Sequence, residues 1–384
     1  MYYNTLEQSM GRDNSSLSEK HAFLILNALP MVGSVLCQRL LKRFHGNVVS
    51  IFNSSEAELL SIKGLGKETV NKIQNWRKYF DLEKELSSIA SRKIHFVTLN
   101  DPYYPKTLKE IYDPPIGFYH IGEMKEIAQP CVSIVGTRMA SLYGRKQARE
   151  IARELAKLGF CIVSGMARGI DYEAHMGALE VGGQSVAVFG NGLDIIYPPE
   201  HLELYQALLE QGCVISEFAL GRGADKHSFP MRNRIVAGLS SSVIIVESGV
   251  RGGSMITANF AIEYGREVFA VPGRLDQAQS LGCLQLIKEG ATMFTSIQGL
   301  LEEVDHRNNI HSIAQFETPN QSINYASLSD SERKVLSVLQ EGERLSVNEI
   351  AETTNENISA INALMIQLEL KHCVSKAIDG KYEA

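Results

Sequence analysis

Apolar residues in the middle of the chain come in short continuous runs, separated by stretches in which they recur at helical spacing. The runs are "CVSIVG", "FCIVSG", "SVAVFG", "CVISEF", "SVIIVES" and "EVFAVPG", and the first begins at residue 131. Intervening stretches such as "YGRKQAREIARELAKLG" are typical of a helix with one buried face. A strand that is apolar at every position is covered on both faces, as in a parallel sheet between two layers of helices. Residues 81–302 are therefore predicted to form a doubly wound α/β domain with an extended Rossmann-like parallel sheet.

Two segments precede this sheet. Residues 17 to about 80 read as short helices separated by Gly or Pro turns, which predicts a small all-α domain over 1–80 of the helix-hairpin-helix or SAM-like type. Its "IKGLGKETVNKI" stretch could bring the backbone N–H groups of Gly64 and Gly66 close to a phosphate, or could be a plain glycine-rich connector. Next, "IHFVTLNDPYYPKTLKEIYDPPIGFYHIG" is expected to add one or two strands at the edge of the sheet.

Two further segments follow the sheet. Residues 303–326 are polar and patternless and are interpreted as a linker. Residues 327–384 show three helical patterns and then a β-ribbon around Asp379 and Gly380, which is the order of a winged helix. The candidate recognition helix, near Asn357 to Lys371, carries Glu369 and a single lysine, so it suits the phosphates beside a major groove poorly. We favour a protein-contact or scaffolding role for this domain over reading of a duplex.

Composition and charge indicate which partners, metal sites and location to expect. The chain has 384 residues, 44% of them hydrophobic, and a formal net charge of −6, so an anionic partner must be held by a local basic patch. Six scattered cysteines form no C-x-x-C pair and have no histidine at metal-ligand spacing, which favours reduced, buried thiols and no metal site. No secretory leader and no apolar run of about 18 residues are present, so we expect a soluble, cytoplasmic protein without a membrane association.

The candidate chemistry lies in the loops that follow the strands. In a parallel sheet these loops meet beyond the carboxyl ends of the strands, where ligands bind. One of them leads into "DKHSFPMRNRIVAG", which gathers cations around the ring of Phe229, and another, "GGS", directly precedes a helix and so suits a phosphate. A cationic groove with an aromatic platform is what single-stranded nucleic acid needs. The candidate DNA-binding residues are Gly136, Thr137, Arg138, Ser164, Gly165, Arg168, Lys226, Phe229, Arg232, Asn233, Arg234, Gly252, Gly253, Ser254 and Thr257.

Structural roles are the alternative for several of these residues. Gly136 and Gly165 can serve tight turns alone, and Arg168 can be structural. Arg232 and Arg234 lie two apart on a helix and point different ways, so one of them can pair internally with Glu217 or Asp225. Asp171 and His175 have the i, i+4 spacing of two metal ligands, but without a third ligand a helix cap and a surface histidine fit better.

With these residues in view, the chain resembles the DNA-processing protein A family. The stretches "SIVGTRMAS", "SGMARGIDYEAH", "GNGLDIIYPPEH", "FPMRNRIVAGLS" and "GGSMITANFAIEYGREVFAVPG" match its signatures in order over about residues 100 to 300. The resemblance implies a dimeric protein, not an enzyme and without a cofactor, that binds single-stranded DNA without sequence preference, protects it, and loads the RecA recombinase onto it in natural transformation. It also implies DNA contacts at Arg138 and Lys226, with Phe229 beside them. Some relatives use a lysine directly after the Y-P pair, where this sequence has Pro199.

Two enzyme classes compete with this interpretation. A dinucleotide-dependent enzyme requires G-x-G-x-x-G at the first strand-to-helix turn, but that turn reads "GTRMAS", and the later "GNGLDI" has Ile195 at the third glycine position. The stronger alternative is a nucleotide-processing phosphoribohydrolase of the lysine-decarboxylase-like Rossmann group, which "GGSMITANFAIE" with Glu263 faintly resembles. Glu263, however, is expected deep in its helix and far from the loop.

Overall fold

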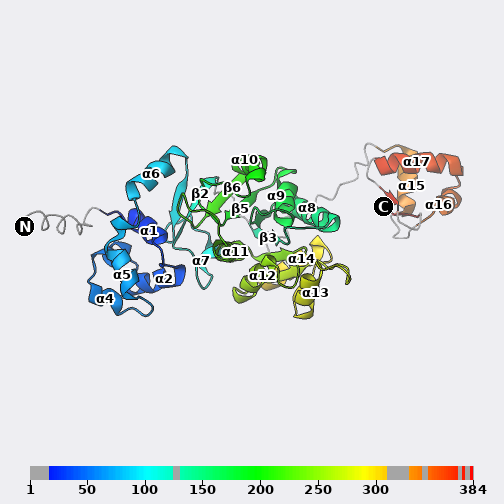
Figure 1. Ribbon diagram of the computed structural model, residues 1–384. Helices are drawn as coiled ribbons and strands as arrows, with labels where there is room; N and C mark the ends of the chain where they lie inside the picture. The colour runs from blue at the N-terminus through cyan, green and yellow to red at the C-terminus, as the bar shows by residue number, and fades with distance from the viewer. Residues whose placement is uncertain are drawn as a thin grey trace, which may run out of the picture. The chain divides into compact units, whose positions relative to one another are not determined.

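A computed structural model describes residues 17–123, 130–308, 328–339, 345–370, 374–376 and 381–383 (Figure 1). The chain divides into two compact units, Met1–His311 and Ser312–Ala384. The first unit contains the sheet and the helices at the N-terminal end of the chain. In the described part of the chain, no helix has both the length and the apolar character needed to cross a bilayer.

Among the described residues of the first unit, nine strands form one sheet in the order β1-β2-β6-β5-β4-β3-β7-β8-β9. The strands from β3 to β9 pair in parallel, whereas β2 pairs antiparallel with β6 and β1 antiparallel with β2. The predicted doubly wound parallel sheet and its added edge strands are therefore confirmed. The strand bounds are β1 His95–Thr98, β2 Gly117–Gly122, β3 Cys131–Val135, β4 Cys161–Ser164, β5 Ser185–Phe189, β6 Gly212–Ser216, β7 Ser242–Ile245, β8 Glu267–Ala270 and β9 Thr292–Met293.

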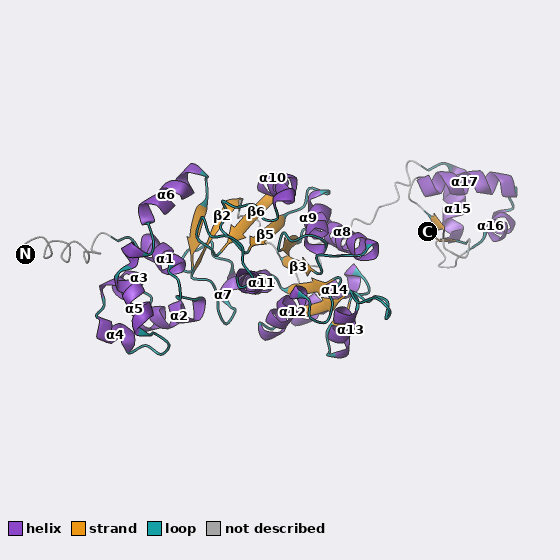
Figure 2. Cartoon of the chain, in the orientation of Figure 1, coloured by secondary structure: helices purple, strands orange, loops and turns teal. Residues whose placement is uncertain are grey.

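Helices cover both faces of the sheet (Figure 2). Strand β5 is buried at every position, and its side chains alternate between the two layers: Ala187 and Phe189 pack on one face, Val186 and Val188 on the other. This explains why the sequence of the strand is continuously apolar. The first layer has helices α8 Leu142–Lys157, α9 Ile170–Leu179 and α10 Leu202–Gln211, and the second has α7 Lys106–Lys109, α11 Ser228–Leu239, α12 Gly253–Glu263 and α13 Leu281–Lys288.

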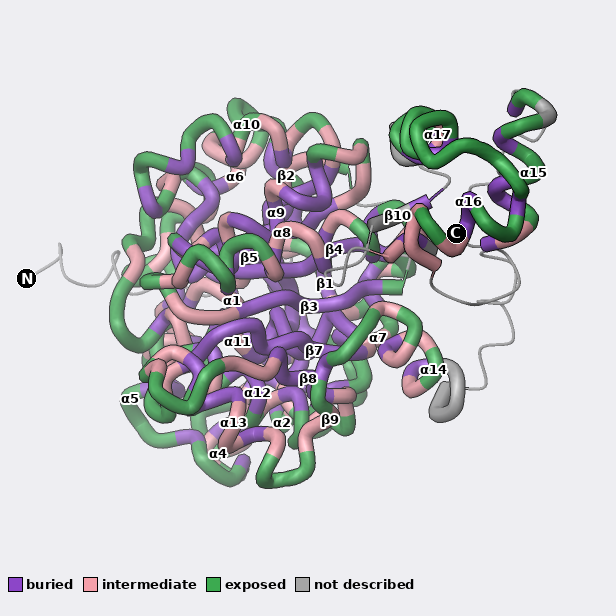
Figure 3. The backbone as a smooth tube through the Cα atoms, turned by 90° about the vertical axis from the view of Figure 1, so that its right-hand side faces the viewer, coloured by how far each residue is buried: buried purple, intermediate pink, exposed green. Residues whose placement is uncertain are grey.

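The helices at the N-terminal end share a core with the sheet rather than enclosing one of their own. The central strands of that sheet, such as β3 and β7, are buried (Figure 3). Buried Phe23 and Leu26 belong to the same apolar cluster as Phe189 of β5, and the Asn27 side-chain amide donates to the Glu217 carbonyl at 2.7 Å. The boundary near residue 80 thus does not separate two cores. These helices are α1 Glu19–Ala28, α2 Ser34–Arg43, α3 Val48–Asn53, α4 Glu56–Leu60, α5 Lys67–Gln74 and α6 Leu82–Ser91.

The turn between α4 and α5 contains both glycines of the predicted helix-hairpin-helix motif. Gly64 has a φ of +95°, and a Cβ there would lie 2.9 Å from a nitrogen of the Arg39 guanidinium. Gly66 is the N-cap of α5. The positive φ explains Gly64 by backbone conformation alone, so the turn by itself supports the connector interpretation as well as the phosphate one.

The second unit has three helices followed by a short antiparallel ribbon. The helices are α15 Asp330–Leu339, α16 Val347–Thr354 and α17 Ile358–Leu370, and the ribbon pairs β10 Ser375–Lys376 with β11 Tyr382–Glu383. Buried Leu336, Ile350 and Met365 give this unit a core of its own. The predicted ribbon turn at Asp379 and Gly380 lies outside the described residues. Helix α14, Ile297–Asn308, enters the segment interpreted as a linker, and residues 309–326 of that segment also lie outside the described ones.

The cysteines behave as small apolar residues. Cys37, Cys131, Cys161, Cys213 and Cys283 are buried, as the sequence predicted, while Cys373 lies outside the described residues. Burial raises the pKa of the Cys283 thiol to about 12, so this group is a poor nucleophile near neutral pH.

Candidate nucleic-acid interface

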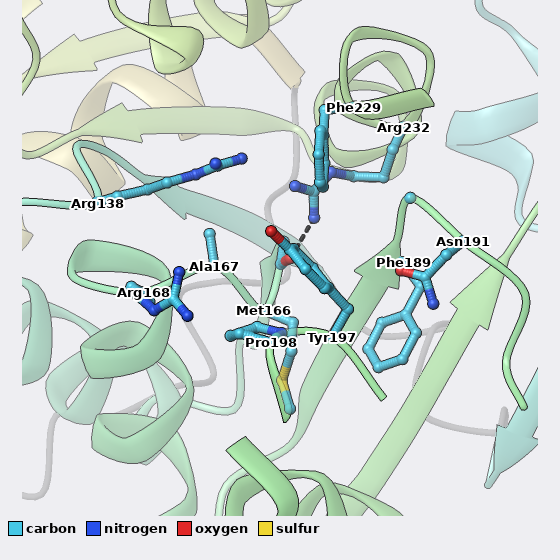
Figure 4. A pocket seen from close by; sticks show the side chains of 12 residues that line it. Arg138, Met166, Ala167, Arg168, Phe189, Asn191, Tyr197, Pro198, Phe229 and Arg232 are labelled. Carbon is cyan, nitrogen blue, oxygen red and sulfur yellow. Dashed lines mark hydrogen bonds between the residues drawn. The ribbon is translucent and has the colours of Figure 1, made fainter. Parts of the chain in front are cut away.

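Loops from neighbouring strands line one pocket at the carboxyl edge of the sheet (Figure 4). Arg138 follows β3, the stretch from Gly165 to Arg168 follows β4, and Gly190 and Asn191 follow β5. Phe229 and Arg232 reach the pocket from the first turns of α11. The fold thus brings together five of the predicted site residues: Arg138, Gly165, Arg168, Phe229 and Arg232.

Arg138 and Phe229 form a cation–π pair at the mouth of this pocket. The Arg138 side chain is exposed, and the central carbon of its guanidinium lies 4.9 Å from the centre of the Phe229 ring. A side chain at Gly190 would place its Cβ 3.1 Å from the ring, so the ring rests directly on backbone. A guanidinium over an aromatic face is held by attraction to the ring electrons. The pair therefore presents a positive charge and a planar surface together.

Arg232 is buried beneath Phe229 and serves the fold. Its guanidinium donates to the carbonyls of Gly165 and Val188, the latter at 2.6 Å, and so joins the ends of β4 and β5. Burial lowers its pKa to about 10, against the opposing effect of Asp171, so Arg232 stays charged at neutral pH. Only 4% of the residue is exposed, which leaves little surface for a phosphate. Arg232 supports the pocket from inside.

Arg234 points away from the pocket. It forms ion pairs with Glu217 and Asp113, with 3.6 Å between its Nε and the Asp113 Oδ2, and it is 4% exposed. Burial alone would lower its pKa, but Glu217 and Asp113 raise it overall. The interpretation in which one of the two arginines pairs with Glu217 is thus confirmed. Arg234 is unavailable to a phosphate, and we leave it out of the proposed DNA contacts.

The predicted hydroxyl donors are also used internally. Ser164 is buried and donates from Oγ to the Ile134 carbonyl at 2.7 Å, and buried Ser254 donates to the Ser248 hydroxyl at 2.8 Å. Thr257 is 2% exposed. What remains open at the start of α12 is backbone: Gly252 is the N-cap, and exposed Gly253 has free space around its Cβ position. The Asn233 amide donates to the Gly253 carbonyl at 3.2 Å and ties α11 to this turn.

Sequence reasoning missed Glu247, which occupies the topological switch point between β3 and β7. Its carboxylate accepts hydrogen bonds from the Ser141 backbone N–H at 2.9 Å and from the Ser141 hydroxyl at 2.5 Å, and it is 2% exposed. A Cβ at Gly144 would lie 2.3 Å from it. The Glu247 side chain therefore occupies the position at the N-terminus of α8 where a dinucleotide-binding fold holds the pyrophosphate. This argues strongly against the dinucleotide-dependent class.

The loop after β3 is held in place by contacts with Glu247 and Ile170. The Thr137 backbone N–H donates to the Glu247 carbonyl at 2.7 Å, and a Cβ at Gly136 would lie 2.5 Å from Ile170. Both residues therefore have structural roles that place Arg138, their neighbour, at the pocket.

Asp171 and His175 are structural as well. The buried Asp171 carboxylate accepts from the backbone N–H groups of Gly165 at 3.1 Å and Ala167 at 3.3 Å, which fixes the loop after β4. His175 lies 2.7 Å from the Ser185 hydroxyl and is fully buried, so the expectation of a surface histidine was wrong. Burial lowers its pKa to about 3, so the ring is neutral. Among the described residues, no group of three or more His, Cys, Asp or Glu side chains could hold a metal.

Three more residues bear on the site, and two of them, Tyr197 and Arg168, line the pocket. Lys226 is exposed on the loop three residues before Phe229. Tyr197, which sequence reasoning did not select, is 38% exposed, and its ring centre lies 5.8 Å from that of Phe229. Arg168 forms an exposed ion pair with Glu200. The only sequence signal for Tyr197 is its place in "IIYPPEH" after β5.

The pocket is too small for an enclosed nucleotide. Its volume is about 10 Å³, room for about one water molecule, whereas small-molecule sites measure about 300–1,000 Å³. Glu263, the residue that suggested a phosphoribohydrolase, is exposed at the last position of α12, and the loop at issue precedes the first position. The arrangement suits contact with a ligand that lies across the mouth.

Several known proteins are similar to this chain in sequence and in fold. Residues 95–305, more than half of the chain, match the model for DNA recombination-mediator protein A. The Protein Smf of Synechocystis is 36% identical over 288 residues, which cover 74% of this chain and 72% of that protein. The X-ray structure of DNA processing protein A from Streptococcus pneumoniae is similar with a TM-score of 0.65 and 33% identity, over 74% of this chain and 97% of that one. A structure of the protein from Helicobacter pylori, described for its single-stranded DNA binding mode, has a TM-score of 0.50 and 34% identity, over 55% of this chain and 95% of that one.

Proposed function

The chain belongs to the DNA recombination-mediator protein A family, and from this premise we propose that it binds single-stranded DNA without sequence preference. The observation that carries the proposal is the cation–π pair of Arg138 and Phe229 at the mouth of a pocket that is too small to enclose a nucleotide. A guanidinium can bind a phosphate, and an aromatic ring can receive the face of any base. Because the pocket is too small to surround a base and read its edge, we expect the protein to bind all four bases.

The same geometry favours a single strand over a duplex. In a duplex the base faces are stacked on one another and are closed to a protein ring. A flexible single strand can turn a base onto Phe229 while its phosphates reach Arg138 and Lys226. The proposed DNA contacts are therefore Arg138, Lys226, Phe229 and Arg168, with the backbone at Gly252 and Gly253 as an additional anion site.

The wider role follows from the family. We propose that the protein protects single-stranded DNA and loads the RecA recombinase onto it in natural transformation, that it acts as a dimer, and that it is not an enzyme. The exposed positions of α17, including Ile358, Asn362 and Ile366, carry no charge in the described part of that helix, which supports a protein-contact role for the C-terminal unit.

A gel-shift titration with single-stranded and duplex oligonucleotides at two ionic strengths tests the proposal. We expect the single strand to bind more tightly than the duplex. Three phosphate contacts, at a slope of about −0.7 each, predict an affinity loss of roughly twentyfold between 50 and 200 mM salt. Preference for the duplex, or affinity independent of salt, would contradict the proposed function.

Replacement of Phe229 tests the cation–π pair. Phe229→Ala is expected to cost about 1–3 kcal/mol of binding free energy through lost stacking. It should also reduce the salt dependence, because the Arg138 guanidinium loses the ring that holds it in place. Phe229→Trp keeps an aromatic face and serves as the control. Fluorescence anisotropy with labelled oligo-dT measures both quantities, and a Phe229→Ala variant with the parent affinity would assign the ring to packing alone.

A further inference from the structure

The wall of the pocket carries a second aromatic ring, which lies beside Phe229. Tyr197 is 38% exposed, and the planes of Tyr197 and Phe229 are inclined at 42° with 5.8 Å between ring centres. In the close view, the Tyr197 ring extends into the pocket between Pro198 and the Arg232 guanidinium (Figure 4). Two separate rings at one mouth can receive two different bases of a strand, since stacking on an aromatic face requires no particular base.

The same wall carries a cation that is already paired. Arg168 lines the pocket, and its guanidinium donates to the Glu200 carboxylate, with 52% of the Arg168 side chain and 47% of the Glu200 side chain exposed. The hydrogen bond with Glu200 raises the pKa of Arg168, and that with Arg168 lowers the pKa of Glu200, so both stay ionised near neutral pH. An exposed pair of this kind is weakly held because water and salt screen it. A phosphate can therefore take the place of the carboxylate.

We propose that Tyr197, Arg168 and Glu200 form a second nucleotide subsite for single-stranded DNA, beside the Arg138–Phe229 pair. Tyr197 receives a base, Arg168 binds a phosphate, and the Glu200 carboxylate competes with that phosphate for Arg168. The proposal rests on the proposed single-strand binding and specifies where a further nucleotide lies.

The competition has a measurable consequence. After a phosphate displaces Glu200 from Arg168, the carboxylate still lies within a Debye length of that phosphate, about 8 Å at physiological salt, and repels it. The native protein should therefore bind DNA less tightly than a variant in which residue 200 is uncharged. Removal of a surface carboxylate is expected to strengthen DNA binding only where that carboxylate lies close enough to a bound phosphate to repel it.

Glu200→Gln tests this, with Glu203→Gln as the matched control. Glu203 is exposed in the first turn of α10, three residues further along, so both variants change the net charge equally. In anisotropy titrations with oligo-dT at 0.15 M salt, we expect Glu200→Gln to bind roughly two- to fivefold more tightly than the parent. Glu203→Gln should change affinity much less. In an Arg168→Ala background, which binds more weakly, the gain from Glu200→Gln should shrink.

Tyr197 is tested by the same titration. Tyr197→Ala should weaken binding roughly fivefold or more, and Tyr197→Trp should retain most of the affinity. Thermal unfolding of each variant identifies any loss of folding, in which case Tyr197→Leu replaces Tyr197→Ala. A parent protein that does not bind oligo-dT overturns the proposed function and the subsite with it. A parent that binds, together with Tyr197 variants of unchanged affinity or a Glu200→Gln variant no tighter than Glu203→Gln, overturns the subsite alone.

Discussion

Replacing Arg138 and Lys226 together by alanine should weaken oligo-dT binding by at least about tenfold at 0.15 M salt, because two phosphate contacts are lost. Arg138 is exposed over the Phe229 ring, and Lys226 is exposed three residues before that ring. Each single-strand phosphate contact contributes about 0.7 to the slope of log affinity against log salt, so the slope should fall by about 1.4. Titration of labelled oligo-dT at several salt concentrations gives both numbers.

The control replaces two cations outside the pocket. Arg43 in α2 and Lys157 at the end of α8 are exposed and lie in surface ion pairs with Glu58 and Glu154. Arg43→Ala with Lys157→Ala lowers the net charge by the same amount. We expect this control to bind nearly as the parent does. If the Arg138 and Lys226 double variant kept the parent slope, the assignment of the DNA contacts would have to be abandoned.

Arg234→Met should destabilise the protein by about 3–5 kcal/mol, because it leaves the carboxylates of Glu217 and Asp113, which are only 11% and 17% exposed, without a positive partner. Urea denaturation followed by circular dichroism measures the change in the free energy of unfolding. Without urea, under conditions in which the variant is folded, its affinity for oligo-dT should match that of the parent. This contrast separates a structural arginine from a DNA contact.

A second variant sharpens the stability test. Glu217→Gln combined with Arg234→Met removes one of the uncompensated charges, so the double variant should be less destabilised than the sum of the two single changes. A loss below about 1 kcal/mol for Arg234→Met would show that the ion pairs contribute little to stability.

Local pattern was sufficient for the main elements of the fold. Continuous apolar runs predicted strands buried on both faces, and β5 shows why, since Val188 and Phe189 face different helix layers. Helical periodicity likewise located the helices at the N-terminal end. It did not reveal that Phe23 and Leu26 pack into the same core as the sheet, because an amphipathic helix identifies its buried face but not the surface that covers it.

The two arginines of α11 show what could not be predicted about the site from the sequence. Arg232 and Arg234 lie about 200° apart around a helix, so the sequence could say that they diverge. It named Glu217 as a possible partner, but it could not tell that both guanidinium groups would be buried. That outcome depends on Asp171, Asp113 and Glu217, which come from distant parts of the chain.

Local periodicity, and the rule that parallel strands end together, were therefore enough to predict the alternation of strands and helices and the edge at which polar loops meet. They also led to Arg138 and Lys226, both of which are exposed. Which polar groups bind one another inside the protein is visible only in the folded chain. Glu247 fills the switch point, Arg234 is neutralised by two carboxylates, and Tyr197 is brought beside Phe229. Pairing and burial are set by contacts between segments far apart in the chain, and no local pattern records them.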